Sequence, residues 1–84
     1  MFEIDFDQDW SYYWQRVPRE QHERLLKKIR ELREEKRFRH LKLGLPHFAL
    51  EAGQYRICFT EKGHKRILAF VGNHKEYEKW LGLR

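Results

Sequence analysis

The spacing of the hydrophobic residues changes from a helical period to a strand period at the Gly44–Pro46 segment, and that change most limits what the chain can fold into. From Trp10 to that segment the apolar residues recur at helical intervals, and after it they alternate with polar residues. A period of 3.6 residues predicts amphipathic helices, whereas a period of two predicts strands. Because 84 residues leave room for one core, the sequence predicts a helical part followed by a sheet in a single domain, 1–84.

The predicted elements follow in the order strand, two-helix hairpin, three-strand meander and short C-terminal helix. The first strand is Phe2–Phe6, where apolar and acidic residues alternate strictly. The remaining elements are predicted at residues 10–17, 19–36, 47–52, 55–60, 65–71 and 76–83. Turns at Gly53-Gln54 and around Gly63 predict antiparallel pairing of the last three strands. The predicted fold class is α+β, a small antiparallel sheet with its helices on one face.

The composition favours a folded domain over a disordered chain. Charged residues make up 37% of the sequence, but 40% hydrophobic and 15% aromatic residues supply a core. One cysteine excludes an intrachain disulfide framework, which fits a reducing compartment. No apolar run approaches the ~20 residues of a membrane span, and the acidic start is unlike a secretory signal. We therefore expect a cytoplasmic protein with no membrane partner.

Charge is distributed unevenly along the chain, whose formal net charge is +5. Residues 1–9 hold four acids and no base, so the remaining 75 residues carry 18 bases and 9 acids, a balance of +9. Residues 36–47 and 62–75 contain no acid, and four of the five histidines lie between residues 40 and 74. Clustered bases attract polyanions, so these stretches predict a phosphate-binding face. The plainer alternative is a solvated basic surface, or bases that complement a helix dipole.

Arg56 lies on the predicted central strand, on the face opposite to Tyr55, Ile57 and Phe59. A guanidinium on a sheet face needs an anion or water, because an unpaired buried charge is costly. Two interpretations stay open. One is a structural ion pair with Glu51 on the neighbouring strand, and the other is a clamp for a phosphate group.

His74 follows the end of the last predicted strand, a loop position of the kind that often carries function. An imidazole titrates near neutral pH and can act as acid or base. Lys75 and Tyr77 lie at the same strand end, and Arg56 lies on the adjacent strand. Together these groups could take a proton from a ribose 2′-hydroxyl and stabilise a phosphorane without a metal ion.

Other kinds of site are not indicated. Cys58 has no CxxC partner, and no pair of histidines lies four residues apart on a predicted helix, so a zinc site is not expected. The basic half lacks paired carboxylates for metal-dependent phosphoryl chemistry, and no glycine-rich loop has a nucleotide-binding spacing. A cysteine in mid-strand is most often a small buried hydrophobe. The sequence therefore predicts neither a metal nor a cofactor.

Three short motifs occur in order along the chain. They are Leu41-Lys42-Leu43-Gly44 after the helices, Leu50-Glu51-Ala52-Gly53-Gln54-Tyr55-Arg56-Ile57 at the hairpin, and Phe70-Val71-Gly72-Asn73-His74-Lys75-Glu76-Tyr77 near the end. Together with the order of elements, they resemble the RelE/ParE superfamily of toxins from type II toxin–antitoxin systems. The closing His-Lys-Glu-Tyr is similar to the His-x-Glu-Tyr ending of HigB-like members. The likeness covers nearly the whole chain and implies a RelE-like fold.

The resemblance implies an endoribonuclease, an mRNA interferase that inhibits translation by cutting mRNA in the ribosomal A site without a metal ion. The ribose 2′-hydroxyl would be the nucleophile, Arg56 would stabilise the phosphate in the transition state, and His74 would be the general base or acid. Lys42 and Lys75 would bind or polarise the phosphate, and Tyr77 would stack on a base or orient the substrate. The implied partners are the ribosome, mRNA and a cognate antitoxin protein, in a toxin–antitoxin complex that can oligomerise.

The acid-free stretches would add further contacts to RNA. From their charge and the resemblance, we expect such contacts from Lys75, Lys65, Lys62, His47 and Arg39. Glu51 departs from the family pattern, since many members have an arginine two residues before the hairpin glycine. A carboxylate there could pair with Arg56 and weaken phosphate binding, or could itself act as a base.

Two other functions are compatible with these residues. A ParE-like relative would share the fold but poison DNA gyrase and cut no RNA. Such members generally lack the catalytic set, so His74 and Lys42 favour the nuclease. A basic RNA-binding module without catalysis would bind RNA in a salt-dependent manner and leave it whole.

Overall fold

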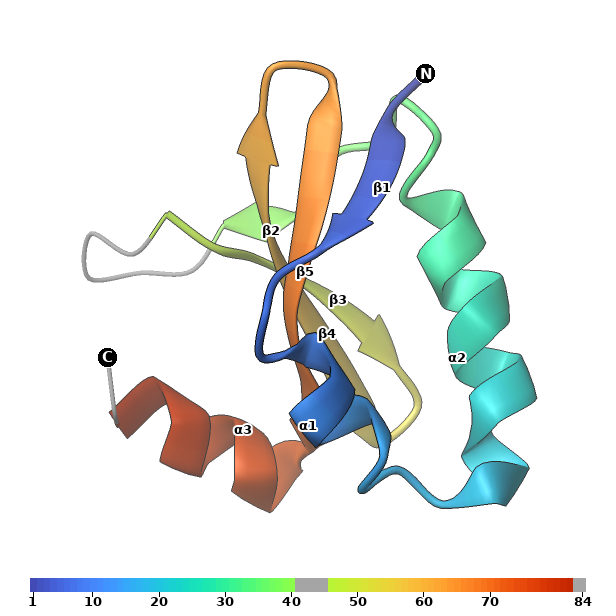
Figure 1. Ribbon diagram of the computed structural model, residues 1–84, viewed down its shortest axis with the longest axis vertical. Coiled ribbons are helices and arrows are strands. Elements are labelled where there is room, and N and C mark those ends of the chain that lie inside the picture. The colour runs from blue at the N-terminus through green and yellow to red at the C-terminus, as the bar shows by residue number, and fades with distance from the viewer. Residues whose placement is uncertain (41–45, 83–84) are drawn as a thin grey trace.

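The computed structural model describes residues 1–40 and 46–82. Its elements are β1 (Glu3–Phe6), α1 (Trp10–Trp14), α2 (Arg19–Glu31), β2 (Arg39–His40), β3 (Phe48–Ala52), β4 (Tyr55–Lys62), β5 (Lys65–Asn73) and α3 (His74–Gly82) (Figure 1). The predicted order of strand, two helices, three-strand meander and helix is confirmed. The two-residue strand β2 is an addition, and it is too short for hydrophobic periodicity to reveal.

The strands form one sheet, which within the described ranges has the order β1-β5-β4-β3-β2. β3 with β4 and β4 with β5 pair antiparallel, as their tight turns require. β1 instead pairs parallel with β5, from Glu3 opposite Lys65 to Phe6 opposite Leu68. The α+β class is confirmed, but the sheet is mixed rather than purely antiparallel. The two helices act as a crossover to the far edge, so the returning meander ends beside β1 and runs in the same direction.

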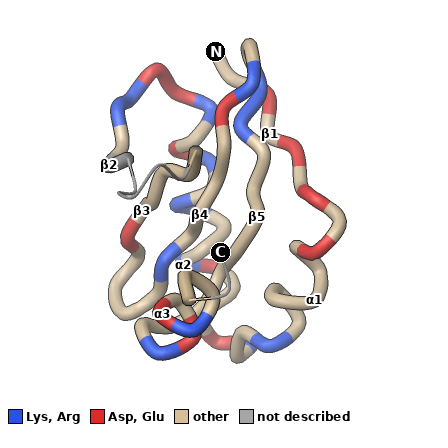
Figure 2. The backbone as a smooth tube through the Cα atoms, turned by 90° about the vertical axis from the view of Figure 1, so that its left-hand side faces the viewer, with Lys and Arg blue, Asp and Glu red and all other residues tan. Residues whose placement is uncertain are grey.

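The helices cover both faces of the sheet, and the prediction that they lie on one face is wrong. α2 lies against one face, and α3 crosses the end of the other (Figures 1 and 2). Leu25 of α2 packs with Phe59 in a first hydrophobic cluster, while Phe70 and Trp80 stack in a second, with ring centroids 4.9 Å apart. β5 is buried on both faces over residues 68–71. This double burial explains why its sequence is an apolar run without alternation.

The short helix α1 shields the part of β5 that β1 leaves open. β1 pairs with β5 only as far as Leu68. Beyond that point Trp10 is buried in the first cluster, and the ring of Tyr13 meets Phe70 edge-on, with centroids 4.9 Å apart. α1 ends at Trp14, earlier than predicted. A covered edge cannot pair with another chain, so α1 protects the strand that leads into α3.

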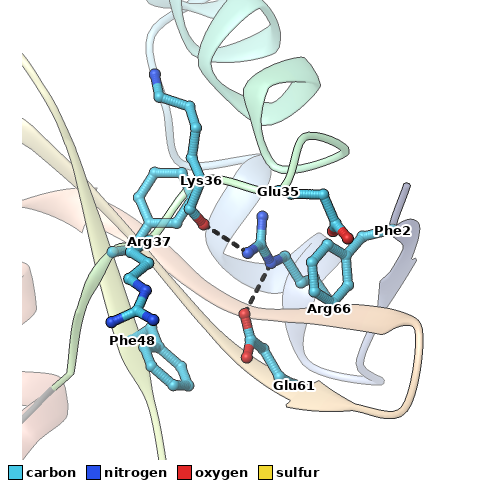
Figure 3. Close-up of a pocket in the computed structure, with 8 residues that line it drawn as sticks. Phe2, Glu35, Lys36, Arg37, Phe48, Glu61 and Arg66 are labelled. Atoms are coloured by element: carbon cyan, nitrogen blue, oxygen red, sulfur yellow. Dashed lines mark hydrogen bonds and ion pairs between the residues drawn. The ribbon is translucent and has the colours of Figure 1, made fainter.

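Arg66 fastens the end of α2 to the sheet (Figure 3). This residue is 2% exposed, and its Nε donates to a carboxylate oxygen of Glu61 at 2.9 Å. Its Nη atoms donate to the backbone carbonyls of Leu32, Glu34 and Lys36 at 2.8 to 2.9 Å. These carbonyls face Arg66 instead of the next helical turn, so α2 stops short of Lys36, where the sequence predicted its end.

This burial corrects one expectation about the second acid-free stretch. Arg66 belongs to that stretch, yet its donors serve the fold, so it is a structural residue and not a phosphate ligand. A hollow of about 490 Å³ lies beside it, with Phe2, Arg37 and Phe48 among its walls (Figure 3). The hollow adjoins the end of β4, far from the strand's start at Tyr55.

Candidate functional site

The start of β4 and the end of β5 meet at one end of the sheet. Their antiparallel register pairs Tyr55 with Asn73 and Arg56 with Gly72. His74, the first residue of α3, comes directly after Asn73 and so lies near the start of β4. A groove of about 340 Å³ there is lined by Gly53, Gln54, Arg56, Asn73, His74 and Lys75. Three residues that the sequence singled out for phosphate chemistry therefore share one surface.

The hairpin between β3 and β4 forms one wall of this groove. Gly53 has a backbone φ of 63°, in the left-handed region that strains other residues. A Cβ at this position would also collide with the guanidinium of Arg24 on α2. The backbone geometry therefore requires the glycine of the hairpin motif, and the tight turn brings Gln54 to the edge of the groove.

Arg56 is half-buried and projects on the face of the sheet that α3 covers. Its guanidinium carbon lies 4.8 Å from the centre of the Tyr77 ring, a cation–π contact that fixes the side chain against the helix. Gly72, which is opposite Arg56 on β5, contributes no side chain to this surface. Arg56 is thus held in place from one side while it lines the groove on the other.

Glu51 is the cross-strand neighbour of Arg56, as the structural interpretation requires. No ion pair joins the two side chains in the part of the chain that the structure describes. The structural interpretation of Arg56 therefore finds no support in the geometry. Among the described residues, the Arg56 guanidinium contacts the Tyr77 ring and lines the groove.

His74 and Lys75 are the first two residues of α3, and both are exposed. Nε2 of His74 lies 3.4 Å from a carboxylate oxygen of Glu78, one helical turn further on. This contact is an ion pair only when the imidazole is protonated. Both side chains are about two-thirds exposed, at 63% and 64%, so solvent weakens the interaction.

Tyr77 is 6% exposed and belongs to the second hydrophobic cluster. Its ring touches Phe70 as well as Arg56, with ring centroids 6.4 Å apart in the Phe70 pair. A buried ring has no free face on which an RNA base could stack. The structure therefore places Tyr77 as a support for Arg56, and base stacking by this residue is not part of the site.

The other predicted RNA contacts do not gather here. Lys62 and Lys65 pair across the turn at the opposite end of the β4–β5 hairpin, and both are exposed. His47 is only 8% exposed and meets Trp80 edge-on, with ring centroids 5.1 Å apart, so its ring is not at a surface that RNA can reach. The backbone of Arg39 is part of β2, and Lys42 lies outside the described residues.

Tyr55 precedes Arg56 and belongs to the residues packed on the first cluster. Burial raises the pKa of its hydroxyl above the ordinary value, and the carboxylates of Glu76 and Glu20 add to the shift. The neutral form of the phenol is therefore favoured at this position.

In the described ranges, no arrangement of side chains is suited to metal binding or to thiol chemistry. Within them, no three or more His, Cys, Asp or Glu side chains are grouped so that they could hold a metal ion. Cys58 is a fully buried thiol in the second hydrophobic cluster, the structural role expected of it. Among the same residues, no helix is long and apolar enough to cross a bilayer.

Asn73 and Glu76 shape the site as well, a role that was not predicted from the sequence. The amide nitrogen of Glu76 donates to Oδ1 of Asn73 at 2.9 Å, and the amide nitrogen of Asn73 donates to Oε1 of Glu76 at 2.8 Å. This reciprocal pair is a capping box, and it starts α3 at His74. Asparagine followed three residues later by glutamate is the sequence signal that predicts such a start.

The chain matches no protein-family model, and no curated protein matches it significantly. Solved structures do match it. A chain of the RelB–RelE antitoxin–toxin complex from Methanococcus jannaschii superposes with a TM-score of 0.74 at 17% identity, over 90% of this chain and 96% of that one. The isolated E. coli RelE toxin superposes with a TM-score of 0.71 at 17% identity, over 99% and 98% of the two chains.

The intact E. coli RelBE toxin–antitoxin complex gives the highest identity of these three. A chain of that complex superposes with a TM-score of 0.69 at 25% identity, over 87% of this chain and 96% of that one. Each likeness spans most of both chains, so it concerns the whole arrangement of helices and strands and not one motif. The chain therefore has the RelE-like toxin fold.

Proposed function

We propose that the protein is the toxin of a type II toxin–antitoxin system and that it cuts mRNA in the ribosomal A site without a metal ion. One observation carries the proposal: Arg56, His74 and Lys75 line the same groove. A guanidinium fork, a proton acceptor and a second cation are the groups that let a ribose 2′-hydroxyl cleave its own phosphodiester. The likeness to RelE toxins and RelB–RelE complexes supports the same class.

In the proposed reaction His74 takes the proton from the 2′-hydroxyl, and the 2′-oxygen attacks the adjacent phosphorus. Arg56 and Lys75 neutralise the charge that collects on the non-bridging oxygens. The bond from phosphorus to the 5′-oxygen breaks, and that oxygen takes up a proton from water. The products are a 2′,3′-cyclic phosphate and a 5′-hydroxyl.

Neighbouring groups assist this assignment of roles. The Glu78 carboxylate, 3.4 Å from Nε2 of His74, faces the positive charge that forms when the imidazole accepts its proton. The Tyr77 ring under Arg56 keeps the guanidinium from rotating freely. The phosphate contact expected of Lys42 remains part of the proposal.

We also propose a cognate antitoxin, the ribosome and mRNA as partners. Two of the solved relatives are RelB–RelE complexes, which supports an antitoxin that binds this fold. The net charge of +5 favours association with ribosomal RNA and mRNA. A toxin that acts on translating ribosomes works in the cytoplasm, where those ribosomes are.

The decisive experiment is brief induction in growing cells followed by mapping of mRNA 5′ ends. We expect wild type to produce cuts at codon positions on translated messages, and we expect His74→Ala and Arg56→Ala to abolish them. Circular dichroism of the purified variants confirms that they fold. A Lys65→Ala variant, which changes an exposed base at the far end of the hairpin, serves as the charge-matched control.

Two results would overturn the proposal. Gyrase-dependent DNA damage without mRNA cleavage would identify a ParE-like poison instead. RNA that remains whole after incubation with translating ribosomes and the bound protein would identify a non-catalytic RNA-binding module.

A further inference from the structure

We infer that Glu76 is the positioning residue of the groove. It holds the first turn of α3 so that His74 lines the groove and Tyr77 lies under Arg56. The inference rests on the proposed function, because that geometry matters through the reaction that it serves. Three contacts of the Glu76 side chain carry it.

The first contact is the capping box with Asn73. Oε1 of Glu76 accepts from the amide nitrogen of Asn73 at 2.8 Å, while Oδ1 of Asn73 accepts from the amide nitrogen of Glu76 at 2.9 Å. A helix start leaves backbone donors without partners, and this box satisfies two of them. It therefore fixes Asn73 as the last residue of the strand and His74 as the first of the helix.

The second contact is with the end of β5. A Cβ placed on Gly72 would lie 3.0 Å from both Cβ and Oε1 of Glu76, and 2.7 Å from Cζ of Phe70. The Glu76 side chain therefore rests directly on the backbone of Gly72, the residue that pairs with Arg56. Glu76 is thereby fixed relative to the sheet and to Arg56, and not only relative to its own helix.

The third contact is with Arg16, two residues beyond the end of α1. Oε2 of Glu76 lies 3.8 Å from Nη2 of Arg16, whose side chain is 53% exposed. An exposed pair at this separation contributes little stability by itself. The pair does show that the two carboxylate oxygens of Glu76 have separate partners. Oε1 accepts the hydrogen bond from Asn73, and Oε2 faces the Arg16 guanidinium.

The helical period makes this cap matter for catalysis. His74 and Tyr77 are three residues apart on α3, so a rotation or shift of its first turn moves both together. One of them lines the groove and the other supports Arg56. A displacement of about 1 Å in a reacting group can lower a rate by about 100-fold. Glu76 therefore acts on the reaction through the two residues that it places.

The test compares Glu76→Ala with Glu76→Gln. Glutamine can complete a capping box, whereas alanine cannot. We expect Glu76→Ala to lower kcat for ribosome-dependent cleavage by about 10- to 100-fold with little change in KM. We expect Glu76→Gln to restore most of the rate. Glu23→Ala, which removes an exposed carboxylate from α2, is the matched control and should leave kcat unchanged.

A second readout does not depend on cleavage. Nuclear magnetic resonance of the free protein should show the His74 imidazole and Tyr77 ring signals shifted in Glu76→Ala and close to wild type in Glu76→Gln. If Glu76→Ala fails to fold, Asn73→Ala removes the other half of the box and should move the same signals. Arg16→Ala should move neither, because it leaves the cap intact.

Two outcomes would overturn the inference. One is a Glu76→Ala variant with wild-type kcat and unshifted His74 and Tyr77 signals. The other is a Glu76→Gln variant as impaired as Glu76→Ala, which would make the charge, and not the cap, the important property. If wild type cuts no RNA, the proposed function fails, while the resonance comparison still decides whether Glu76 places His74 and Tyr77.

Discussion

At the scale of single residues, two arginines of the central strands differ in what their guanidinium groups contact. Arg66 is 2% exposed and donates to Glu61 and to three backbone carbonyls. Arg56 is half-buried, rests on the Tyr77 ring and lines a groove. The guanidinium with its donors already engaged stabilises the fold, and the one that lines the groove can bind an anion.

This contrast gives a prediction for Arg56. Alanine at this position should lower the cleavage rate by about 100- to 1000-fold, the usual effect of removing one donor to a transition-state oxyanion. Lysine should rescue only part of the loss, since it keeps the charge but not the planar fork. Single-turnover cleavage on programmed ribosomes measures both. Full activity of a folded Arg56→Ala protein would contradict the role.

At the scale of elements, the end of α2 is held by two kinds of contact. Arg66 draws the carbonyls after the helix towards the sheet. Lys36 donates to Glu31 at 3.0 Å, and Lys28 lies 3.5 Å from the same carboxylate. The helix therefore ends where tertiary contacts and local charge agree, several residues before residue 36, where the sequence predicted its end.

Arg66→Met should destabilise the protein more than any surface change. The substitution leaves the Glu61 carboxylate and three carbonyls without their donor, which costs about 3 kcal/mol or more in free energy of unfolding. Urea unfolding measures the loss. Lys65→Met, on the exposed neighbour, is the control and should stay within about 0.5 kcal/mol of wild type. A loss below about 1 kcal/mol for Arg66→Met would show that the carbonyls find other partners.

Glu31 gives a pH prediction at the same helix end. The hydrogen bond from Lys36 lowers the pKa of Glu31 below its ordinary value of 4.5; burial opposes this shift, and the charge of Lys28 adds to it. Because the folded value is the lower one, the carboxylate stabilises the fold above its ordinary pKa. That contribution is lost as the pH falls through the folded value.

Glu31→Gln should therefore reduce stability near pH 7 and have little effect at a pH below the folded pKa of Glu31. Urea unfolding at the two pH values measures the difference. Glu23→Gln, in the exposed part of the same helix, controls for the loss of a surface carboxylate. An equal loss at both pH values would assign the effect of Glu31→Gln to packing and not to charge.

At the scale of the whole molecule, the sheet has a hydrophobic cluster on each face and an uneven distribution of charge. The acids of residues 1–9 follow β1 and the run into α1, at the edge of the sheet opposite β2 (Figure 2). The groove lies at the β3–β4 turn and the start of α3, where Arg56 and Lys75 supply positive charge. The acids of residues 1–9 and the groove therefore lie apart, since β1 pairs with the Lys65–Leu68 end of β5 and the groove lies at its Asn73 end.

This separation predicts how RNA binding depends on salt. A short single-stranded oligonucleotide with a 2′-deoxy residue at the cleavage position should bind more weakly as salt rises. Lys75→Ala should reduce the steepness of the plot of log affinity against log salt by about 0.7 to 1, one phosphate contact. Lys65→Ala should not, because Lys65 lies at the far end of the hairpin. Equal effects of the two variants would mean that RNA has no preferred site.

Much of the fold could be predicted from local sequence patterns, because the spacing of apolar residues in a segment reflects which of its side chains are buried. The alternation at Tyr55–Thr60 and the glycine turn before it predicted the β4 hairpin, and Gly53 indeed needs a positive φ. The placement of Arg56 beside His74 also followed from strand order and antiparallel register. The His74 start of α3 was within reach of the sequence too, through the Asn73–Glu76 spacing.

The sequence by itself determined the order of elements, the tight turns and the neighbourhood of Arg56 and His74, since each depends on residues close in the chain or paired across one hairpin. Only the tertiary structure decided that β1 runs parallel to β5, that α3 covers the second face, and that His47 is buried while Arg56 lines a groove. Those outcomes depend on which distant segments meet in space, because burial and pairing are properties of the packed molecule and not of any one stretch of residues.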